Sequence, residues 1–284
     1  MKRNGWMHLV LGGALVLGVG TAVAQGPGGG HRGPFGGPME LMGFEGMHGG
    51  KVVTAAPFSA TSTSTTKQTL QDGTTTINRT VQGAIYRDSQ GRSRREVTFT
   101  GVAPLETTGG THKMVAIFDP VAGVHYMLNP DKKVAYKMTP PAGAGGNAAK
   151  AQAFEQKMQA RQAQEEASGA LKVDSLGTQN INGVNATGTR TTRTIAAGEI
   201  GNSAPIQIVS ERWYSPDLQT VVQSTRTDPR FGTTTFSLSN IQKTEPAATF
   251  FTVPADYTVQ AGGPGRHGHH TGAAAGVAAP PPAN

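Results

Sequence analysis

Few side chains in this 284-residue sequence have the type and spacing that catalysis requires. Between the two glycine-rich ends there are two histidines, His112 in a Gly-Gly-Thr-His context and His125 beside Tyr126 in a short apolar stretch. A general base needs a partner within hydrogen-bond reach, and the sequence indicates none for either histidine. We therefore interpret His125 as a structural residue.

Glu211 and Asp217 flank Trp213 and Tyr214, and paired carboxylates are the signature of glycoside hydrolysis. Aromatic residues make up only 6% of the chain, which is too few for an aromatic sugar-binding cleft. The motifs of serine hydrolases, zinc proteases and P-loop NTPases do not occur. We predict a protein that is not an enzyme, with no catalytic residues and no cofactor.

The sequence has no cysteine, which excludes disulfides, thiolate metal sites and cysteine nucleophiles. His267, His269 and His270 lie close together near the C-terminus, and imidazole suits zinc, copper and nickel. We interpret them as part of a solubilising tail, with weak metal binding as the alternative. No metal site is predicted in the body of the chain.

The first 24 residues are typical of an export signal. A basic start precedes an apolar stretch from Leu9 to Ala24, and Ala22 and Ala24 form a small-residue cleavage site before Gln25. The stretch is short for the roughly 30 Å of a membrane interior. We predict export to the periplasm or secretion, with no transmembrane segment after cleavage.

The remaining chain divides by composition. Residues 25–50 are expected to be a disordered Gly/Pro-rich tether and residues 260–284 a disordered tail, because such sequences bury too little apolar area to offset their ordering entropy. Residues 51–259 are expected to form a single β-rich domain. The net charge of +7 falls to +5 when Lys2 and Arg3 are removed with the signal, and no basic cluster argues for nucleic acid.

Two threonine-rich blocks, about 51–139 and 171–259, are punctuated by Asx-Gly and Pro-containing turn signals at hairpin spacing. The segments between these signals predict an antiparallel meander of about eleven strands. The predicted strands are 58–70, 74–87, 92–101, 113–118, 124–128, 133–138, 172–181, 184–195, 205–215, 219–227 and 233–243. Arg87, Arg92, Arg94 and Arg95, which flank one of the turns, are expected to face solvent.

An alanine-rich segment at about 147–167 separates the blocks and predicts one inserted helix. Its large apolar residues are Phe154 and Met158, so it either lies across a sheet on a thin stripe or stands away from it. We favour one sheet assembled from both blocks; two separate domains are the alternative.

Four phrases in the blocks resemble those of uncharacterised secreted bacterial proteins of the periplasmic lipoprotein-carrier (outer-membrane lipoprotein-sorting) type. They are residues 85–92 (IYRDSQGR), 119–123 (DPVAG), 213–218 (WYSPDL) and 240–257, which contains Phe-Thr-Val-Pro. The resemblance implies a curved, unclosed antiparallel half-barrel. It also implies an apolar concave face of the kind in which such carriers hold acyl chains.

These observations favour a non-enzymatic envelope protein that binds an acyl chain or a lipoprotein in the concave face of its sheet. For Trp213 packing in the core is the favoured interpretation. The candidate ligand-binding residues are Ile77, Ile85, Phe118, Trp213, Phe236 and Leu238. The alternative is a structural or sensory periplasmic protein that binds another envelope protein through a sheet edge or through the inserted helix.

Overall fold

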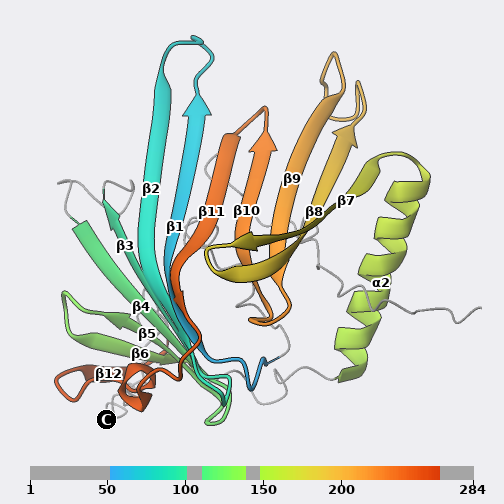
Figure 1. Ribbon diagram of the computed structural model, residues 1–284. Coiled ribbons are helices and arrows are strands. Elements are labelled where there is room, and N and C mark those ends of the chain that lie inside the picture. The colour runs from blue at the N-terminus through green and yellow to red at the C-terminus, as the bar shows by residue number, and fades with distance from the viewer. Residues whose placement is uncertain (1–51, 101–110, 139–147, 263–284) are drawn as a thin grey trace, which may run out of the picture.

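A computed structural model describes residues 52–100, 111–138 and 148–262, which form a twelve-stranded sheet with one α-helix at its side (Figure 1). The first block contributes β1 (Phe58–Thr69), β2 (Thr76–Arg87), β3 (Ser93–Thr100), β4 (Thr111–Asp119), β5 (Val124–Asn129) and β6 (Val134–Met138). The second part contributes α2 (Ala148–Ala167), β7 (Leu171–Ile181), β8 (Val184–Ile195), β9 (Ile206–Ser215), β10 (Thr220–Asp228), β11 (Gly232–Gln242), the 3₁₀ helix η1 (Ala248–Phe251) and β12 (Thr258–Ala261).

Each block forms its own meander, and the pairing of β1 with β11 joins the two meanders into one sheet. The strand order is β12-β6-β5-β4-β3-β2-β1-β11-β10-β9-β8-β7, so the sheet stays unclosed between β12 and β7. The predicted half-barrel of strands from both blocks, with one inserted helix, is confirmed. The twelfth strand, β12, was not among the predicted ones; it pairs in parallel with β6 and extends to Ala261.

The sheet bends so strongly that strands far apart in it meet on one face. Asn182, at the tip of the β7–β8 hairpin, donates a hydrogen bond from Nδ2 to the Leu238 carbonyl of β11 over 2.6 Å. Three strands, β8 to β10, separate β7 from β11 in the sheet. Ile181 and Val184 of the same hairpin pack with Phe58 and Leu238 in one buried cluster. Side chains of separated strands converge in this way only on the concave side of a curved sheet, so this face is the concave one. We call it the inner face; it is the face of Phe58 and Leu238.

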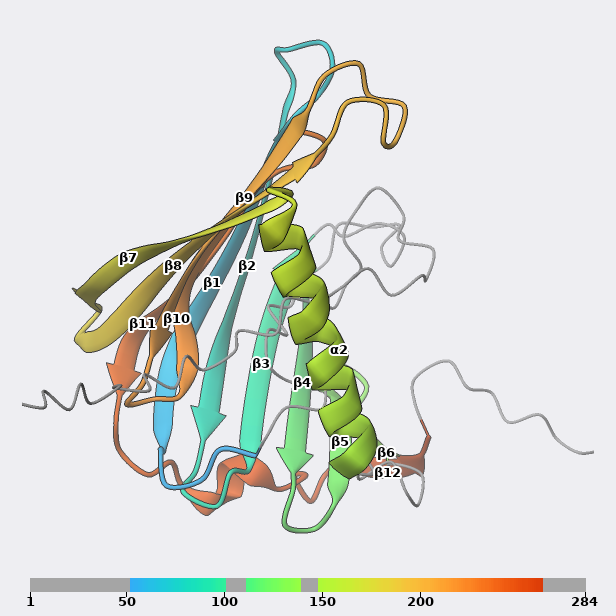
Figure 2. The same ribbon diagram turned by 90° about the vertical axis from the view of Figure 1, so that its right-hand side faces the viewer.

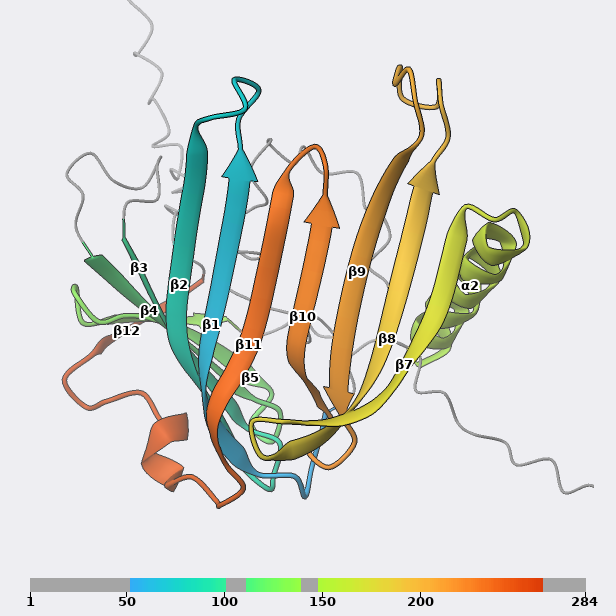
Figure 3. The same cartoon turned by 45° about the horizontal axis from the view of Figure 1, so that its top comes forward.

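Turn chemistry and one close approach produce this shape. Asn182 and Gly183 both have positive φ (50° and 89°), as a two-residue hairpin turn requires. At Gly83 in β2, an added Cβ would lie 2.1 Å from the Glu96 carbonyl oxygen of β3. The lack of a side chain there lets β3 come close, at the place where the sheet turns from its vertical wall toward β4–β6 (Figures 2 and 3).

A C-terminal segment, residues 243–262, covers the opposite, outer face of β2–β6 and ends as β12. The Phe250 ring stacks on Tyr86 with centroids 4.3 Å apart, and Arg94 donates to the Phe250 carbonyl over 3.1 Å. Val253 and Tyr257 pack against a buried cluster in β4–β6. The members of that cluster are Val115, Ile117, Leu128 and Ala135.

This cover and burial on the inner face correct the expectation that the arginines flanking the Asp88 turn face solvent. Arg87 and Arg95 are only 9% and 7% exposed, and the side chains of Arg92 and Arg94 are 23% and 13% exposed. Arg92 lies over the Phe251 ring at 5.2 Å, so the outer pair of arginines is covered by η1 and its neighbours. The charge pattern alone could not show that a segment 150 residues away in the sequence would fold over these residues.

Candidate functional site

The inner face of β4–β6 is rich in methionine and aromatic side chains. Strand register places Met114, Ala116 and Phe118 of β4 beside Met127 and His125 of β5, and these beside Tyr136 and Met138 of β6. The alternate residues of the same strands form the buried cluster under the C-terminal segment. Both faces of β4 therefore carry apolar side chains, as its continuously apolar sequence predicts.

We call the inner-face set Met114, Phe118, His125, Met127, Tyr136 and Met138 the methionine face. Each of its members is half-buried, whereas the outer-face cluster is fully buried. Methionine is flexible and polarisable, which lets a surface adapt to apolar ligands of irregular shape. Such a face is suited to holding a hydrocarbon chain by contact and dispersion rather than by hydrogen bonds.

His125 belongs to this apolar surface in its neutral form. Its ring meets Phe118 edge to face, with centroids 4.5 Å apart and an interplanar angle of 88°. Burial lowers the pKa of His125 below its usual value of 6.5, because the charged imidazolium loses hydration there. No carboxylate is paired with this ring in the described part of the chain, which fits the structural role predicted for it.

The other end of the inner face is filled by the protein itself. The β7–β8 hairpin folds back over Trp213, which is 9% exposed, and over Leu238, which is 1% exposed. Tyr214, the neighbour of Trp213, is 39% exposed, and Trp213 packs in the core as the sequence analysis favours. The core on this side consists of Phe58, Ala60, Ile181, Val184, Ala186, Trp213, Leu218, Val222 and Leu238.

Register places five of the six candidate ligand-binding residues on the inner face. The sixth, Trp213, packs in the same buried core as Leu238. Leu238 and Phe236 lie opposite Ser62 and Ser64 of β1, and Ile85 lies opposite Ala60. Trp213 and Leu238 are enclosed in the core, while Ile85 and Phe236 pack at its margin and are partly accessible. Ile77 is exposed near the far end of β2, and Phe118 is part of the methionine face.

Sequence reasoning missed most of the methionine face, although a signal was present. Met114, Ala116 and Phe118 alternate with Val115 and Ile117, and similar alternation follows in the next two strands. An alternation with both sets apolar predicts a strand covered on both faces. It does not tell which set lies under another segment of the chain and which remains accessible.

The buried side chain of Arg87 links neighbouring segments at the end of the inner face that the β7–β8 hairpin covers. Arg87, 9% exposed, donates from Nε and Nη2 to the Ala56 carbonyl over 3.0 and 2.8 Å, and Nη2 also donates to the Leu218 carbonyl. Its guanidinium lies 4.8 Å above the Phe58 ring. Burial lowers the pKa of Arg87 to about 10. These contacts tie β2 to the segment before β1 and to the β9–β10 turn.

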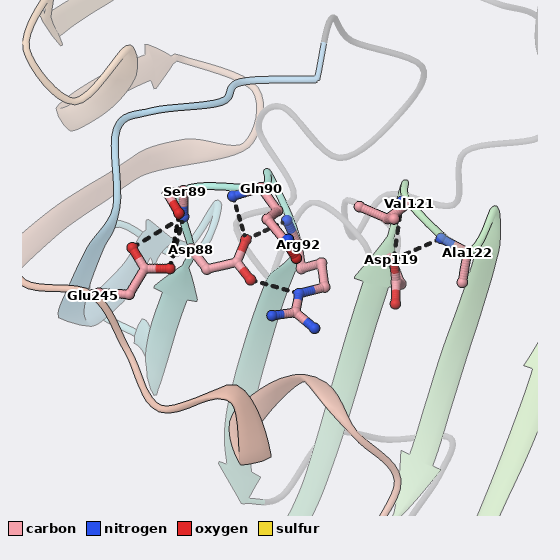
Figure 4. Close-up of polar contacts among 8 residues, drawn as sticks. All are labelled: Asp88, Ser89, Gln90, Arg92, Asp119, Val121, Ala122 and Glu245. Carbon is pink, nitrogen blue, oxygen red and sulfur yellow. Dashed lines mark hydrogen bonds and ion pairs between the residues drawn. The ribbon is translucent and has the colours of Figure 1, made fainter.

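The phrases that resemble lipoprotein carriers build turns at this same end (Figure 4). The Asp88 carboxylate accepts from the amides of Gln90 and Arg92 over 3.0 and 2.8 Å, and Asp119 accepts from two amides of its own turn. Glu245, in the C-terminal segment, accepts from the amide and hydroxyl of Ser89 at 3.1 Å. The polar residues of these phrases therefore stabilise turns of the fold.

Two functional classes find no support in the residues that the structure describes. Those residues contain no cluster of three histidine or acidic side chains that could ligate a metal. The histidines at 267, 269 and 270 and the expected signal at 1–24 lie outside them. None of the described helices combines the length and hydropathy of a membrane span.

No protein-family model matches this chain, and no curated protein sequence matches it. Solved structures do resemble it, at low identity. The MucA/MucB complex of Pseudomonas aeruginosa matches at 12% identity over 72% of this chain and 58% of that chain, with a TM-score of 0.36. LprF from Mycobacterium bovis matches at 12% over 71% and 90%, with a TM-score of 0.31. A LolA superfamily protein from Nitrosomonas europaea matches at 9% over 69% and 90%, with a TM-score of 0.27.

This chain is similar to those proteins and spans less than two thirds of the length of the first of them. The neighbours include a lipoprotein-carrier relative, the LolA superfamily protein, as the turn phrases led us to expect. Because these TM-scores lie below 0.5, the likeness carries no argument about what this chain binds. The case for a ligand rests on the inner face alone.

Proposed function

We propose that this protein is an exported, non-enzymatic binding protein that holds an acyl chain on the inner face of its sheet. The observation that carries the proposal is the methionine face, a half-buried apolar surface on the concave side. The β7–β8 hairpin encloses the core, but no described segment encloses the methionine face in that way. Burying apolar surface there contributes roughly 25 cal/mol per Å², so an acyl chain binds without any catalytic group.

The alternative of strand addition at a sheet edge has less support. The free edge strand β7 is interrupted between Ser175 and Gly177, where the register shifts and Gly177 has a φ of 75°. Bulges of this kind keep an edge from pairing with another chain. The other edge, β12, has only four residues. The acyl-chain proposal is therefore the one we carry forward.

Fluorescent fatty-acid titration of delipidated protein tests the proposal. We expect micromolar affinity, and we expect Met127→Asp to weaken it at least tenfold, because a carboxylate on the methionine face must be desolvated against the chain. Thr225→Asp is the matched control, since it adds the same charge on the outer face of β10. Met127→Gln, which adds no charge, covers the case in which the aspartate variant does not fold.

The proposal fails if the protein takes up no fatty acid. It also fails if Met127→Asp and Thr225→Asp, both folded, bind as tightly as the unmodified protein. Retention of Trp213 fluorescence in a buried environment shows that each variant is folded.

A further inference from the structure

The part of the inner face on β1, β2 and β8–β11 carries arginines above its apolar core. One row of paired residues runs from Arg79 through Thr66 and Thr234 to Arg226. The next row runs from Ser64 through Phe236 and Ser224 to Arg212. Residues paired across neighbouring strands share a face, so these arginines lie on the same face as Phe236.

The carboxylates on this part of the face are already paired. Asp228 holds Arg230 at 2.7 Å, with Arg226 at 3.9 Å. Glu165 of α2 holds Arg193 at 2.7 Å, and this contact brings α2 to the same side of the sheet. Burial raises the pKa of Asp228, but its hydrogen bonds with Arg230 lower that pKa more. The pKa of Asp228 therefore lies below the usual value, and the carboxylate stays ionised beside Arg230.

Two arginines are left without a carboxylate. Arg212 is half-buried, and its Nε is buried with no hydrogen-bond partner among the described residues. Within the same residues, no hydrogen bond or ion pair engages the side chain of Arg79, which is also half-buried. Leaving a buried donor unpaired destabilises the fold, so such a group is a candidate for a partner that is not part of the chain.

Apolar surface begins directly beside these groups. Phe236 is two strands from Arg212, about 10 Å at the usual strand spacing. From Leu238 a row of small side chains, Ser62 and Gly83, leads across β1 and β2 to Val97 and then to Met114 of the methionine face. A cationic site and an apolar face are thus continuous along one surface.

We infer that the bound ligand is an amphiphile with an anionic head group, a carboxylate or a phosphate, which Arg212 holds while its acyl chain lies on the apolar inner face. This inference rests on the proposed function and adds the head-group chemistry. Guanidinium suits either head group, because its forked donors match carboxylate and phosphate oxygens.

Calorimetric titration with monomeric oleate, oleyl alcohol and inorganic phosphate tests the inference. We expect oleate to bind at least tenfold more tightly than oleyl alcohol, with the difference shrinking as salt screens the charges. Arg212→Gln should weaken oleate about tenfold and leave oleyl alcohol unchanged, and Arg79→Gln, at a position four strands away, should change neither affinity. Arg212→Lys, which keeps the charge, should have a smaller effect.

Lys67→Gln is the matched control, because it removes one positive charge from the outer face at the same end of β1 and should change neither affinity. Equal affinities for oleate and oleyl alcohol, or full oleate binding by the folded Arg212→Gln variant, would overturn the inference and leave the proposed function standing. Submillimolar binding of inorganic phosphate alone would overturn it in favour of a free-anion site. Loss of both amphiphiles would remove the proposed function as well.

Discussion

Replacing Asp88 by alanine should destabilise the protein far more than the same change at Asp72. Both carboxylates accept two backbone amides in a turn that joins neighbouring strands. They differ in burial, because Asp88 is 1% exposed whereas Asp72 lies in the open. The pair therefore separates the effect of burial from the effect of turn chemistry.

The magnitude follows from the groups left without a partner. Asp88→Ala removes the acceptor of two amides and of the Arg92 Nε, which lies 2.5 Å from Oδ2. Hydrogen bonds to charged groups contribute about 1.5–3 kcal/mol each and do not add fully, so we expect a loss of about 3 kcal/mol. Asp88→Asn keeps an acceptor for the amides and loses the charge opposite Arg92, so about 1 kcal/mol is expected. In the Asp72 turn, water replaces the lost acceptor, and the loss should be much smaller.

Urea denaturation followed by Trp213 fluorescence measures these differences. The only other tryptophan is Trp6, in the expected signal, so the mature chain reports from its core. The midpoint should fall for Asp88→Ala while the slope stays constant. If Asp88→Ala and Asp72→Ala shift the midpoint equally, burial of the turn does not matter and the reasoning is wrong.

Three further predictions concern the inner face. Because burial lowers the pKa of His125 in the folded protein, the unfolded chain takes up the proton more readily. The free energy of unfolding should therefore be highest above pH 6.5 and fall as the pH drops below that value, and His125→Phe should make this pH dependence weaker. An unchanged slope would contradict this. Gly188→Ala places a Cβ 2.6 Å from Cζ3 of Trp213, so urea denaturation should show a free energy of unfolding lower by about 1–3 kcal/mol and a shifted Trp213 emission. An emission spectrum like that of the unmodified protein would contradict this packing. Arg87→Met leaves the Leu218 carbonyl without its donor, so the free energy of unfolding should fall by about 2 kcal/mol, with a lower urea midpoint. An unchanged midpoint would show that Arg87 does not stabilise this end of the fold.

The sequence predicted the strands and turns well because both are local in origin. Threonine favours a pleated surface, and Asn182-Gly183 supplies the positive φ of a tight hairpin whatever lies nearby. The alternation of Phe236 and Leu238 with serine likewise indicated one apolar face, and the structure buries Leu238 on that face. The alanine-rich helix follows from propensity alone.

Which surfaces are covered could not be predicted in the same way. The expectation for Arg87, Arg92, Arg94 and Arg95 was wrong because η1 and its neighbours, about 150 residues later, fold over Arg92 and Arg94, while Arg87 and Arg95 are buried on the inner face. The candidate ligand residues share a face, yet two of them lie inside a core closed by the β7–β8 hairpin.

The sequence by itself therefore determined the elements, their hairpin order and the chemistry of each strand face, since these depend on neighbours along the chain. Only the tertiary structure decided that β1 pairs with β11, and with it which face is concave, which apolar side chains are enclosed and which stay accessible. Those outcomes depend on contacts between segments that are distant in sequence. A period-two alternation separates the two faces of a strand but does not indicate toward which face the sheet curves.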